Sequence, residues 1–273
     1  MTGDGETLLF EAVSAFNVIT VTEDGQGLRA LWFGKDRVRQ SVIKVGRTAH
    51  LESPYPPVIL AGFSLADHVG SALVLGLGGG VIPSFLRTYF PDMRIDVVEV
   101  DPVVVGVAAR FFGVCEDGAM SIHVEDGRRF LERCGGRYDV IVLDVAGTGG
   151  APAHMITRDF LDSVRGALTA GGLAIANVWN QQANPYYDAT VATYRAVFES
   201  LYIAAARGIG NQVFFALTRA TGLTAETAAT RAQAFSKRHG LPLDLSEAIR
   251  HGFRNGNDEI VTGWVLRDPG AAG

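Results

Sequence analysis

The stretch VLGLGGGVIPSFL, residues 74–86, decides the fold of this 273-residue chain. An apolar run typical of a buried strand meets a glycine-rich turn, and a helix-like stretch follows it. Glycine at such a turn allows positive φ values and lets a ligand approach the backbone closely. The turn glycines are Gly76, Gly78, Gly79 and Gly80. A turn that holds a ligand competes here with a plain tight turn between strand and helix.

The spacing of the glycines restricts the ligand. A phosphate-binding P-loop requires a lysine directly after its last glycine, but no lysine occurs between Lys44 and Lys237. The dinucleotide fingerprint G-x-G-x-x-G requires a third glycine where Val81 stands. The G-x-G-x-G pattern instead suits a turn whose backbone contacts the sugar and amino-acid part of S-adenosylmethionine.

Short apolar runs alternate with helix-like stretches from about residue 55 onward. This alternation predicts an α/β fold, with a parallel sheet covered by helices on both faces. The runs SLYIAAAR (200–207) and NQVFFALTR (211–219) then follow each other without a helix between them, so we expect them to pair antiparallel. The sequence thus predicts a Rossmann-like, mostly parallel seven-stranded sheet that ends in an antiparallel hairpin.

The N-terminal part has a different pattern. Residues 16–44 alternate apolar and polar positions around the hairpin dipeptide Asp24-Gly25 and read as three strands. We expect residues 1–54 to form a small antiparallel β subdomain. Residues 55–273 would form the nucleoside-binding domain with a C-terminal helical extension.

Three carboxylates follow strands of the predicted parallel sheet. Glu99, followed by Val100, ends the second strand, where a carboxylate can accept hydrogen bonds from both ribose hydroxyls. Asp126 precedes Gly127 and can cap the next helix. Asp144 ends a further strand and points into the crevice where α/β sheets bind ligands. The order of these elements along the chain favours an adenosyl ligand.

The composition excludes other classes of protein. Hydrophobic residues make up 48% and charged residues 19% of the chain, which is ordinary for a globular protein with a large core. The net charge of −5 argues against a nucleic-acid partner. We expect no metal site, no signal peptide and no membrane span. Two cysteines, Cys115 and Cys134, suit a reducing compartment, and we expect a cytoplasmic protein.

The motifs together resemble the spermidine synthase family, the polyamine aminopropyltransferases, within the class I S-adenosylmethionine-dependent methyltransferase superfamily. The resemblance covers about residues 16–218. It rests on GGG (78–80), VVEVDP (97–102), EDGRRFL (125–131), YDVIVLDV (138–145) and FLDSVRGALTAGGLAIAN (160–177), in this order. It implies a class I methyltransferase fold, an S-adenosyl donor and a homodimer or homotetramer.

The resemblance also implies roles for individual residues. Glu99 would bind the ribose, and Asp126 the adenine amine. Asp144 matches the family's catalytic aspartate, which positions and deprotonates the attacking amine. Gln40 matches a nucleoside-contacting glutamine, and Tyr55 matches a tyrosine of the substrate site.

Two departures from the family pattern concern polyamine binding. The family has an aspartate directly after the glycines that binds the aminopropyl ammonium, where this chain has Val81. A second family aspartate, which anchors the diamine, is replaced by Gly147. Each lost charged hydrogen bond removes roughly 1.5–3 kcal/mol of binding free energy. Methyl transfer from intact S-adenosylmethionine to a small-molecule acceptor is therefore favoured. The alternatives are aminopropyl transfer from decarboxylated S-adenosylmethionine and a non-catalytic nucleoside-binding scaffold.

Further residues are candidates for the acceptor side. His154 lies in the long stretch VAGTGGAPAHM (145–155), which reads as a loop over the crevice. Trp179 follows the fifth strand and can stack on a substrate. In the stretch NQQANPYYD (180–188), Gln181 and Tyr187 offer neutral hydrogen bonds to an acceptor.

Overall fold

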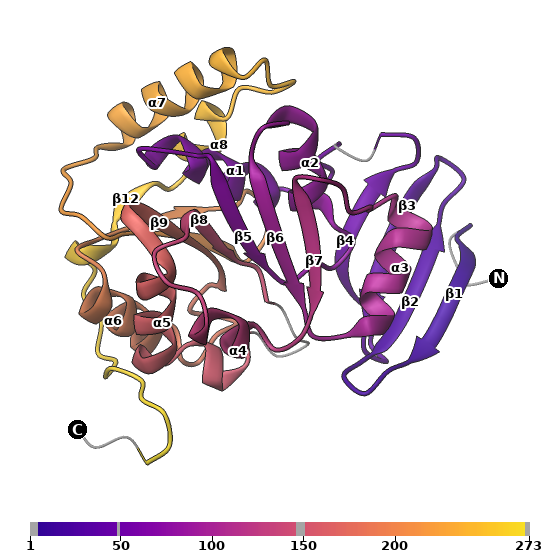
Figure 1. Cartoon of the computed structure of the whole chain (residues 1–273), viewed down its shortest axis with the longest axis horizontal. Helices are drawn as coiled ribbons and strands as arrows, with labels where there is room; N and C mark the ends of the chain where they lie inside the picture. The colour runs from indigo at the N-terminus through magenta and orange to yellow at the C-terminus, as the bar shows by residue number, and fades with distance from the viewer. Residues whose placement is uncertain (1–4, 48–49, 146–150, 271–273) are drawn as a thin grey trace.

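The computed structural model describes residues 5–47, 50–145 and 151–270 and contains two sheets (Figure 1). The larger sheet has the strand order β12-β10-β11-β9-β8-β5-β6-β7. Its strands, in chain order, are β5 (Ser71–Leu75), β6 (Arg94–Glu99), β7 (Met120–Val124), β8 (Tyr138–Leu143), β9 (Leu168–Trp179), β10 (Ser200–Ala205), β11 (Asn211–Leu217) and β12 (Arg254–Asn255). The strands β5 to β9 pair in parallel, whereas β10 and β11 form the predicted antiparallel hairpin. This is the Rossmann-like class I methyltransferase arrangement.

Helices cover both faces of this sheet, as the alternation of apolar runs predicts. Buried side chains of one face pack against α1 (Tyr55–Gly62), α2 (Val81–Tyr89), α3 (Pro102–Phe112), α7 (Ala225–Arg238) and α8 (Ser246–Arg250). Those of the other face pack against α4 (Gly127–Glu132), α5 (Arg158–Ala167) and α6 (Tyr187–Val197). Three short 3-10 helices are η1 (Phe63–Leu65), η2 (Ala153–Met155) and η3 (Gly256–Asp258). The carboxyl ends of the parallel strands remain uncovered by these helices.

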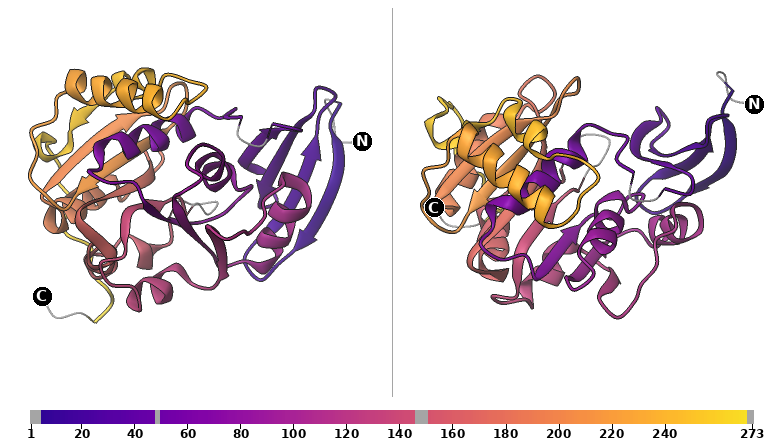
Figure 2. Two further views of the ribbon diagram at one scale, coloured as in Figure 1. Left: turned by 45° about the horizontal axis from the view of Figure 1, so that its top comes forward. Right: turned by 90° about the horizontal axis from the view of Figure 1, so that it is seen from above.

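The smaller sheet is N-terminal and antiparallel, with β1 (Thr7–Val13), β2 (Val18–Glu23), β3 (Leu28–Phe33) and β4 (Val38–Lys44) in sequence order. It lies beside α3 at one end of the molecule (Figure 2). The rings of Phe10 and Phe111 lie 5.6 Å apart between their centroids, and Arg29 donates a hydrogen bond to the carbonyl oxygen of Phe111. These contacts hold the small sheet against the larger domain.

Two predictions about strand number were wrong. The small sheet has four strands rather than three, because TLLFEAV (7–13) pairs with β2 although its sequence does not alternate strictly. The large sheet has an eighth strand, β12, whose two residues pair with the exposed edge of β10. A two-residue strand carries no periodic pattern, so its sequence could not reveal it.

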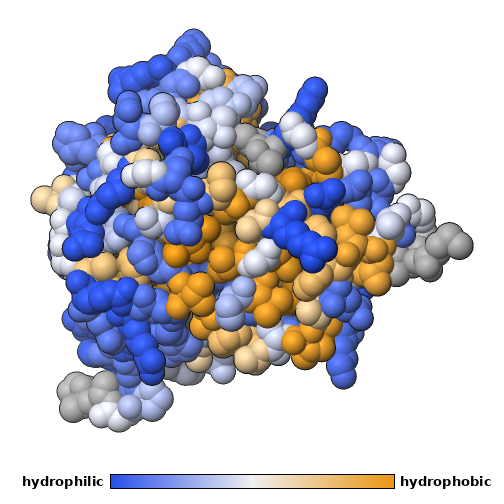
Figure 3. All heavy atoms as spheres, turned by 45° about the vertical axis from the view of Figure 1, so that its right-hand side comes forward, coloured by the Kyte–Doolittle hydropathy of each residue, from blue (hydrophilic) through white to orange (hydrophobic). Residues whose placement is uncertain are grey.

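Hydrophobic residues form a broad patch on the side of the molecule that carries the small sheet (Figure 3). Exposed large apolar side chains of the described residues include Val13 and Phe16 near the turn between β1 and β2, and Val100 after β6. The predicted homo-oligomer remains a prediction. Within the described ranges, no helix combines the length and apolar character needed to cross a membrane.

Candidate active site

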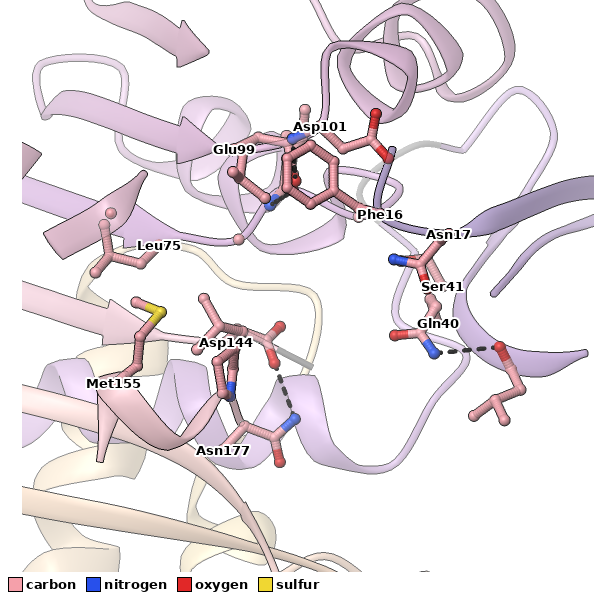
Figure 4. Close-up of a pocket in the computed structure, with 18 of the residues that line it drawn as sticks. Phe16, Asn17, Gln40, Ser41, Leu75, Glu99, Asp101, Asp144, Met155 and Asn177 are labelled. Carbon is pink, nitrogen blue, oxygen red and sulfur yellow. Dashed lines mark hydrogen bonds between the residues drawn. The ribbon is translucent and has the colours of Figure 1, made fainter. Parts of the chain in front are cut away.

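A cavity of about 830 Å³ opens at the carboxyl ends of β5, β6, β8 and β9. Its walls come from the glycine turn after β5, the residues that follow β6 and β8, the end of β9, and strand β4 of the small sheet. Figure 4 shows Glu99 and Asp101 on one side, Asp144 and Asn177 on another, and Asn17, Gln40 and Ser41 reaching in from the small sheet. The cavity thus joins both sheets.

The four glycines of the turn serve two different purposes. Gly76 and Gly78 line the cavity with φ values of 93° and 52°, and a Cβ on Gly76 would overlap the carbonyl oxygen of Asp144. Gly79 and Gly80 do not line the cavity. A Cβ on Gly79 would meet Ser41 and Phe112, and one on Gly80 would overlap Val114. The structure therefore places these two glycines behind the ligand-facing turn, where helix packing requires them.

Glu99 lies at the end of β6 with its carboxylate held by the backbone. One oxygen accepts from the amide of Leu77 at 2.9 Å and the other from the amide of Asp101 at 3.0 Å. Burial raises the pKa of Glu99, and these backbone hydrogen bonds oppose the rise. Each carboxylate oxygen has a further lone pair, so Glu99 can still accept from a ligand hydroxyl in the cavity. Val100, next in the chain, also lines the cavity.

Asp126 begins α4, as its position before Gly127 predicts. Its Oδ1 accepts from the amides of Arg128 and Arg129 at 3.0 and 3.1 Å, which makes it the N-cap. The other oxygen, Oδ2, lies 3.5 Å from Nε2 of His154. Asp126, Gly127 and His154 all line the cavity, so capping leaves one carboxylate oxygen to face a ligand.

Asp144 follows β8 and is held by side chains. Its Oδ1 accepts a hydrogen bond from the side-chain amide (Nδ2) of Asn177 at 2.8 Å, and its Oδ2 accepts one from the hydroxyl of Tyr55 at 3.4 Å. Burial raises the pKa of Asp144, whereas the bonds from Asn177 and Tyr55 oppose this rise. Burial and the nearby carboxylate raise the pKa of Tyr55 far above its usual value. Tyr55 therefore donates its proton, and Asp144 accepts.

A second amide continues this arrangement. Asn211, at the start of β11, donates from its Nδ2 to Oδ1 of Asn177 at 2.8 Å. Because Oδ1 of Asn177 accepts this bond, its NH₂ group is directed at Asp144. Asn211 is 8% exposed. The residues Asp144, Asn177 and Asn211 form what we call the amide chain, and all three line the cavity beside Trp179.

The small sheet supplies side chains that the motifs do not reveal. The residues Val38, Arg39, Gln40 and Ser41 of β4 all line the cavity. An irregularity in the pairing of β3 with β4 falls between the pairs Leu31–Ser41 and Trp32–Arg39, so Gln40 is an extra residue. Such a bulge redirects neighbouring side chains, which accounts for consecutive residues facing one cavity. Gln40 was predicted here from the resemblance, but Arg39 was not.

Two predicted acceptor-site residues lie away from this cavity. Gln181 donates to Asp188 on the surface. The Tyr187 hydroxyl donates to Gln212 of β11 at 2.7 Å and accepts a hydrogen bond from Arg254 of β12. Tyr187 begins α6 and turns with it into the core, so its side chain is directed away from the crevice.

The structure describes only one of the two positions, Val81 and Gly147, at which the chain departs from the family's polyamine-binding pattern. Val81 is the first residue of α2 and is 8% exposed, packed in the core. The side chain directly after the glycines therefore packs in the core and does not line the cavity. Gly147 lies outside the described residues, as do the other residues of 146–150.

Known proteins resemble this chain in sequence. A family model, the spermine/spermidine synthase domain, matches residues 58–206. A polyamine aminopropyltransferase of Vibrio vulnificus is 33% identical over 202 residues, covering 72% of this chain and 67% of that protein. The eEF1A lysine and N-terminal methyltransferase of Mus musculus is 33% identical over 153 residues, covering 52% of this chain but only 22% of that protein.

A solved structure extends the comparison to geometry. Human methyltransferase-like protein 13, in complex with SAH (S-adenosylhomocysteine), has a TM-score of 0.62 at 28% identity, covering 70% of this chain and 94% of that chain. The relatives are thus transferases of two kinds, and one of them was crystallised with an S-adenosyl compound. From the family model and from the Vibrio relative, the chain belongs to the spermine/spermidine synthase family.

Proposed function

We propose that this chain transfers the methyl group of intact S-adenosylmethionine to the amine of a small-molecule acceptor. The donor would lie along the glycine turn, with its ribose hydroxyls at Glu99 and its adenine amine at Oδ2 of Asp126, the oxygen that does not cap α4. Both carboxylates line the cavity and each has an oxygen lone pair available. Gly76, Gly78, Gly127 and Val100 would lie against the nucleoside.

The observation that carries the choice of donor is the charge around the glycine turn. The described residues of the glycine turn offer no carboxylate to an aminopropyl ammonium, since Gly76 and Gly78 have no side chain and Val81 is packed in the core. Arg39 is the one lysine or arginine among the described residues that line the cavity, and the structure gives it no acidic partner. It lies two residues from Ser41, whose Oγ accepts from the amide of Gly79 at 2.9 Å. A cation there attracts a donor with a carboxylate and repels one that ends in an ammonium alone.

The chain's residues then have defined roles. Bound S-adenosylmethionine supplies an electrophilic methyl group on a sulfonium. Asp144 accepts the proton of the attacking amine, since it faces the cavity from the strand end nearest the turn. Asn177 and Tyr55 hold the two carboxylate oxygens in place. The enzyme contributes mainly orientation and a base, because displacement at a sulfonium needs little further assistance.

Aminopropyl transfer is the second candidate. Five carboxylates line the cavity in the described ranges: Glu99, Asp101, Glu125, Asp126 and Asp144. This acidic lining favours a cationic donor or acceptor. Of the five, however, Asp101 accepts a hydrogen bond from the hydroxyl of Ser14 and caps α3. Glu125 forms an ion pair with Arg133. Both are therefore committed within the protein.

The proposed donor is tested by the variant Arg39→Gln, with Lys35→Gln as a control of equal charge change outside the cavity. S-Adenosylhomocysteine carries a carboxylate and methylthioadenosine does not, so titration calorimetry with both isolates the interaction. We expect Arg39→Gln to lower the affinity for the first about three- to tenfold and leave the second unchanged. An equal effect on both ligands, or none, would contradict the proposal.

A further inference from the structure

We propose that a small apolar cavity beside Asp144 is an acceptor subsite, and that the acceptor is an amine with a neutral, mainly apolar substituent. This inference rests on the proposed transfer to an amine at Asp144. It names the part of the acceptor that does not react.

The subsite is a cavity of about 130 Å³ at the carboxyl ends of β8 and β9. It shares four lining residues with the large cavity: Val145, Met155, Asn177 and Trp179. Asn177 is also the residue that binds Asp144. The two cavities therefore lie side by side, and the shared wall starts at the reacting carboxylate.

Apolar side chains make up most of the lining of the subsite. Leu143, Ala176 and Val178 come from the strands, Ile156 from the chain after η2, and Tyr194 from α6. A wholly apolar cavity of about 150 Å³ in another protein binds a benzene ring. A group of that size would fill this space and gain the free energy of apolar burial.

No acidic or basic side chain lines the subsite among the described residues. The polar groups there are neutral and mostly engaged: Thr190 donates to the carbonyl oxygen of Tyr186 at 2.8 Å, and Asn184 accepts from the amide of Tyr186 at 3.0 Å. A second ammonium of a diamine would lose its water here and find no counter-charge, which is costly. The subsite therefore selects against polyamine-type acceptors.

The segment 180–188 also connects the subsite to the acceptor. Its neutral side chains are expected near an acceptor from the sequence, but Gln181 and Tyr187 face elsewhere. Asn184, Pro185 and Tyr186 of the same segment line the subsite instead. The stretch thus reaches the acceptor region through different residues.

The test uses three amines as probes, each titrated into the protein saturated with S-adenosylhomocysteine: phenethylamine, methylamine and putrescine. We expect phenethylamine to bind about tenfold or more tightly than methylamine, since its ring can enter the subsite, and more tightly than putrescine. Equal binding of phenethylamine and methylamine, or tighter binding of putrescine, would overturn the subsite. Failure to bind S-adenosylhomocysteine at all would instead overturn the proposed function.

Two variants that fill the subsite locate the effect. Ala176→Leu fills it from β9, and Ala153→Leu fills it from η2, where the alanine is exposed and folding is not at risk. Ala225→Leu on α7 is the control. We expect both filling variants to reduce phenethylamine binding about tenfold and leave methylamine and S-adenosylhomocysteine within twofold. Unchanged phenethylamine binding, or a loss of S-adenosylhomocysteine binding, would overturn the assignment.

Discussion

The donor half and the acceptor half of the cavity hold their carboxylates in different ways. In the donor half, backbone amides bind Glu99 and Asp126. In the acceptor half, the side chains of Asn177 and Tyr55 bind Asp144, and Asn211 supports Asn177. Backbone amides are fixed by the fold, whereas side-chain partners can change with a single substitution. The difference suggests that a family can keep one donor site while its acceptor site varies.

The comparison is tested most strongly by Asp144→Asn, which removes the acceptor half's base and keeps its shape. We expect the transfer rate to fall about 10²- to 10⁴-fold, while the affinity for S-adenosylhomocysteine stays within about twofold. Rate assays with the best amine of the probe panel and calorimetry measure the two halves separately. A matched loss of donor affinity would show that the halves are not independent.

The same variant should be more stable than the wild type. Burial raises the pKa of Asp144, so the ionised carboxylate costs folding free energy at pH values above that raised pKa. As the pH falls, the carboxyl group of Asp144 becomes protonated in both the folded and the unfolded protein, and this cost disappears. Thermal unfolding should show the gain of Asp144→Asn at neutral and alkaline pH and its disappearance in acid. A variant less stable than the wild type at neutral pH would contradict this account.

Glu99→Ala should produce the next largest effect, confined to the donor half. It removes the acceptor for the ribose hydroxyls and leaves the amides of Leu77 and Asp101 without their partner. We expect roughly a 10- to 100-fold loss of affinity for both S-adenosylhomocysteine and methylthioadenosine. Glu116→Ala, on the surface, is the control. Retained affinity for methylthioadenosine would show that Glu99 does not bind the nucleoside.

The amide chain should be visible in the pH dependence of the rate. The bond from Asn177 lowers the pKa of Asp144 against the effect of burial, so Asn177→Ala should raise that pKa further. We expect the acidic limb of the rate profile to move up by about one pH unit. Asn211→Ala should move it less, because Asn177 stays but loses its fixed orientation. An unmoved profile would reduce Asn177 to a packing residue.

The smallest effect is expected for Asp268, whose hydrogen bonds stabilise the donor half. Asp268 accepts from Arg128 and from Thr157 at 2.8 Å, and Arg128 also donates to the carbonyl oxygen of His154 at 3.3 Å. Asp268→Asn should lower methylthioadenosine affinity about two- to fivefold, with Asp258→Asn on η3 as control. Faster amide exchange of residues 153–157 should accompany it. Equal effects of the two variants would show that Asp268 does not stabilise the donor half.

The donor half follows from the sequence because each of its parts is local. Glycines after a strand, a carboxylate at the next strand end and an aspartate before a helix are contiguous patterns, and they correctly placed Glu99 and Asp126 at the cavity. Gly79 and Gly80 share the pattern but serve packing, since a glycine motif does not say what its missing Cβ would touch. The acceptor half joins residues 55, 144, 177 and 211 from separate elements. Arg39 depends on a bulge, and no local pattern predicts either arrangement.

The central claim is that the donor site is built for intact S-adenosylmethionine. The most direct measurement is calorimetric titration of the wild-type protein with S-adenosylmethionine, S-adenosylhomocysteine, decarboxylated S-adenosylmethionine and methylthioadenosine under one set of conditions. We predict that the first two bind more tightly than the last two, because only they present a carboxylate to Arg39. Tighter binding of decarboxylated S-adenosylmethionine than of S-adenosylmethionine would contradict the claim and assign the chain to aminopropyl transfer.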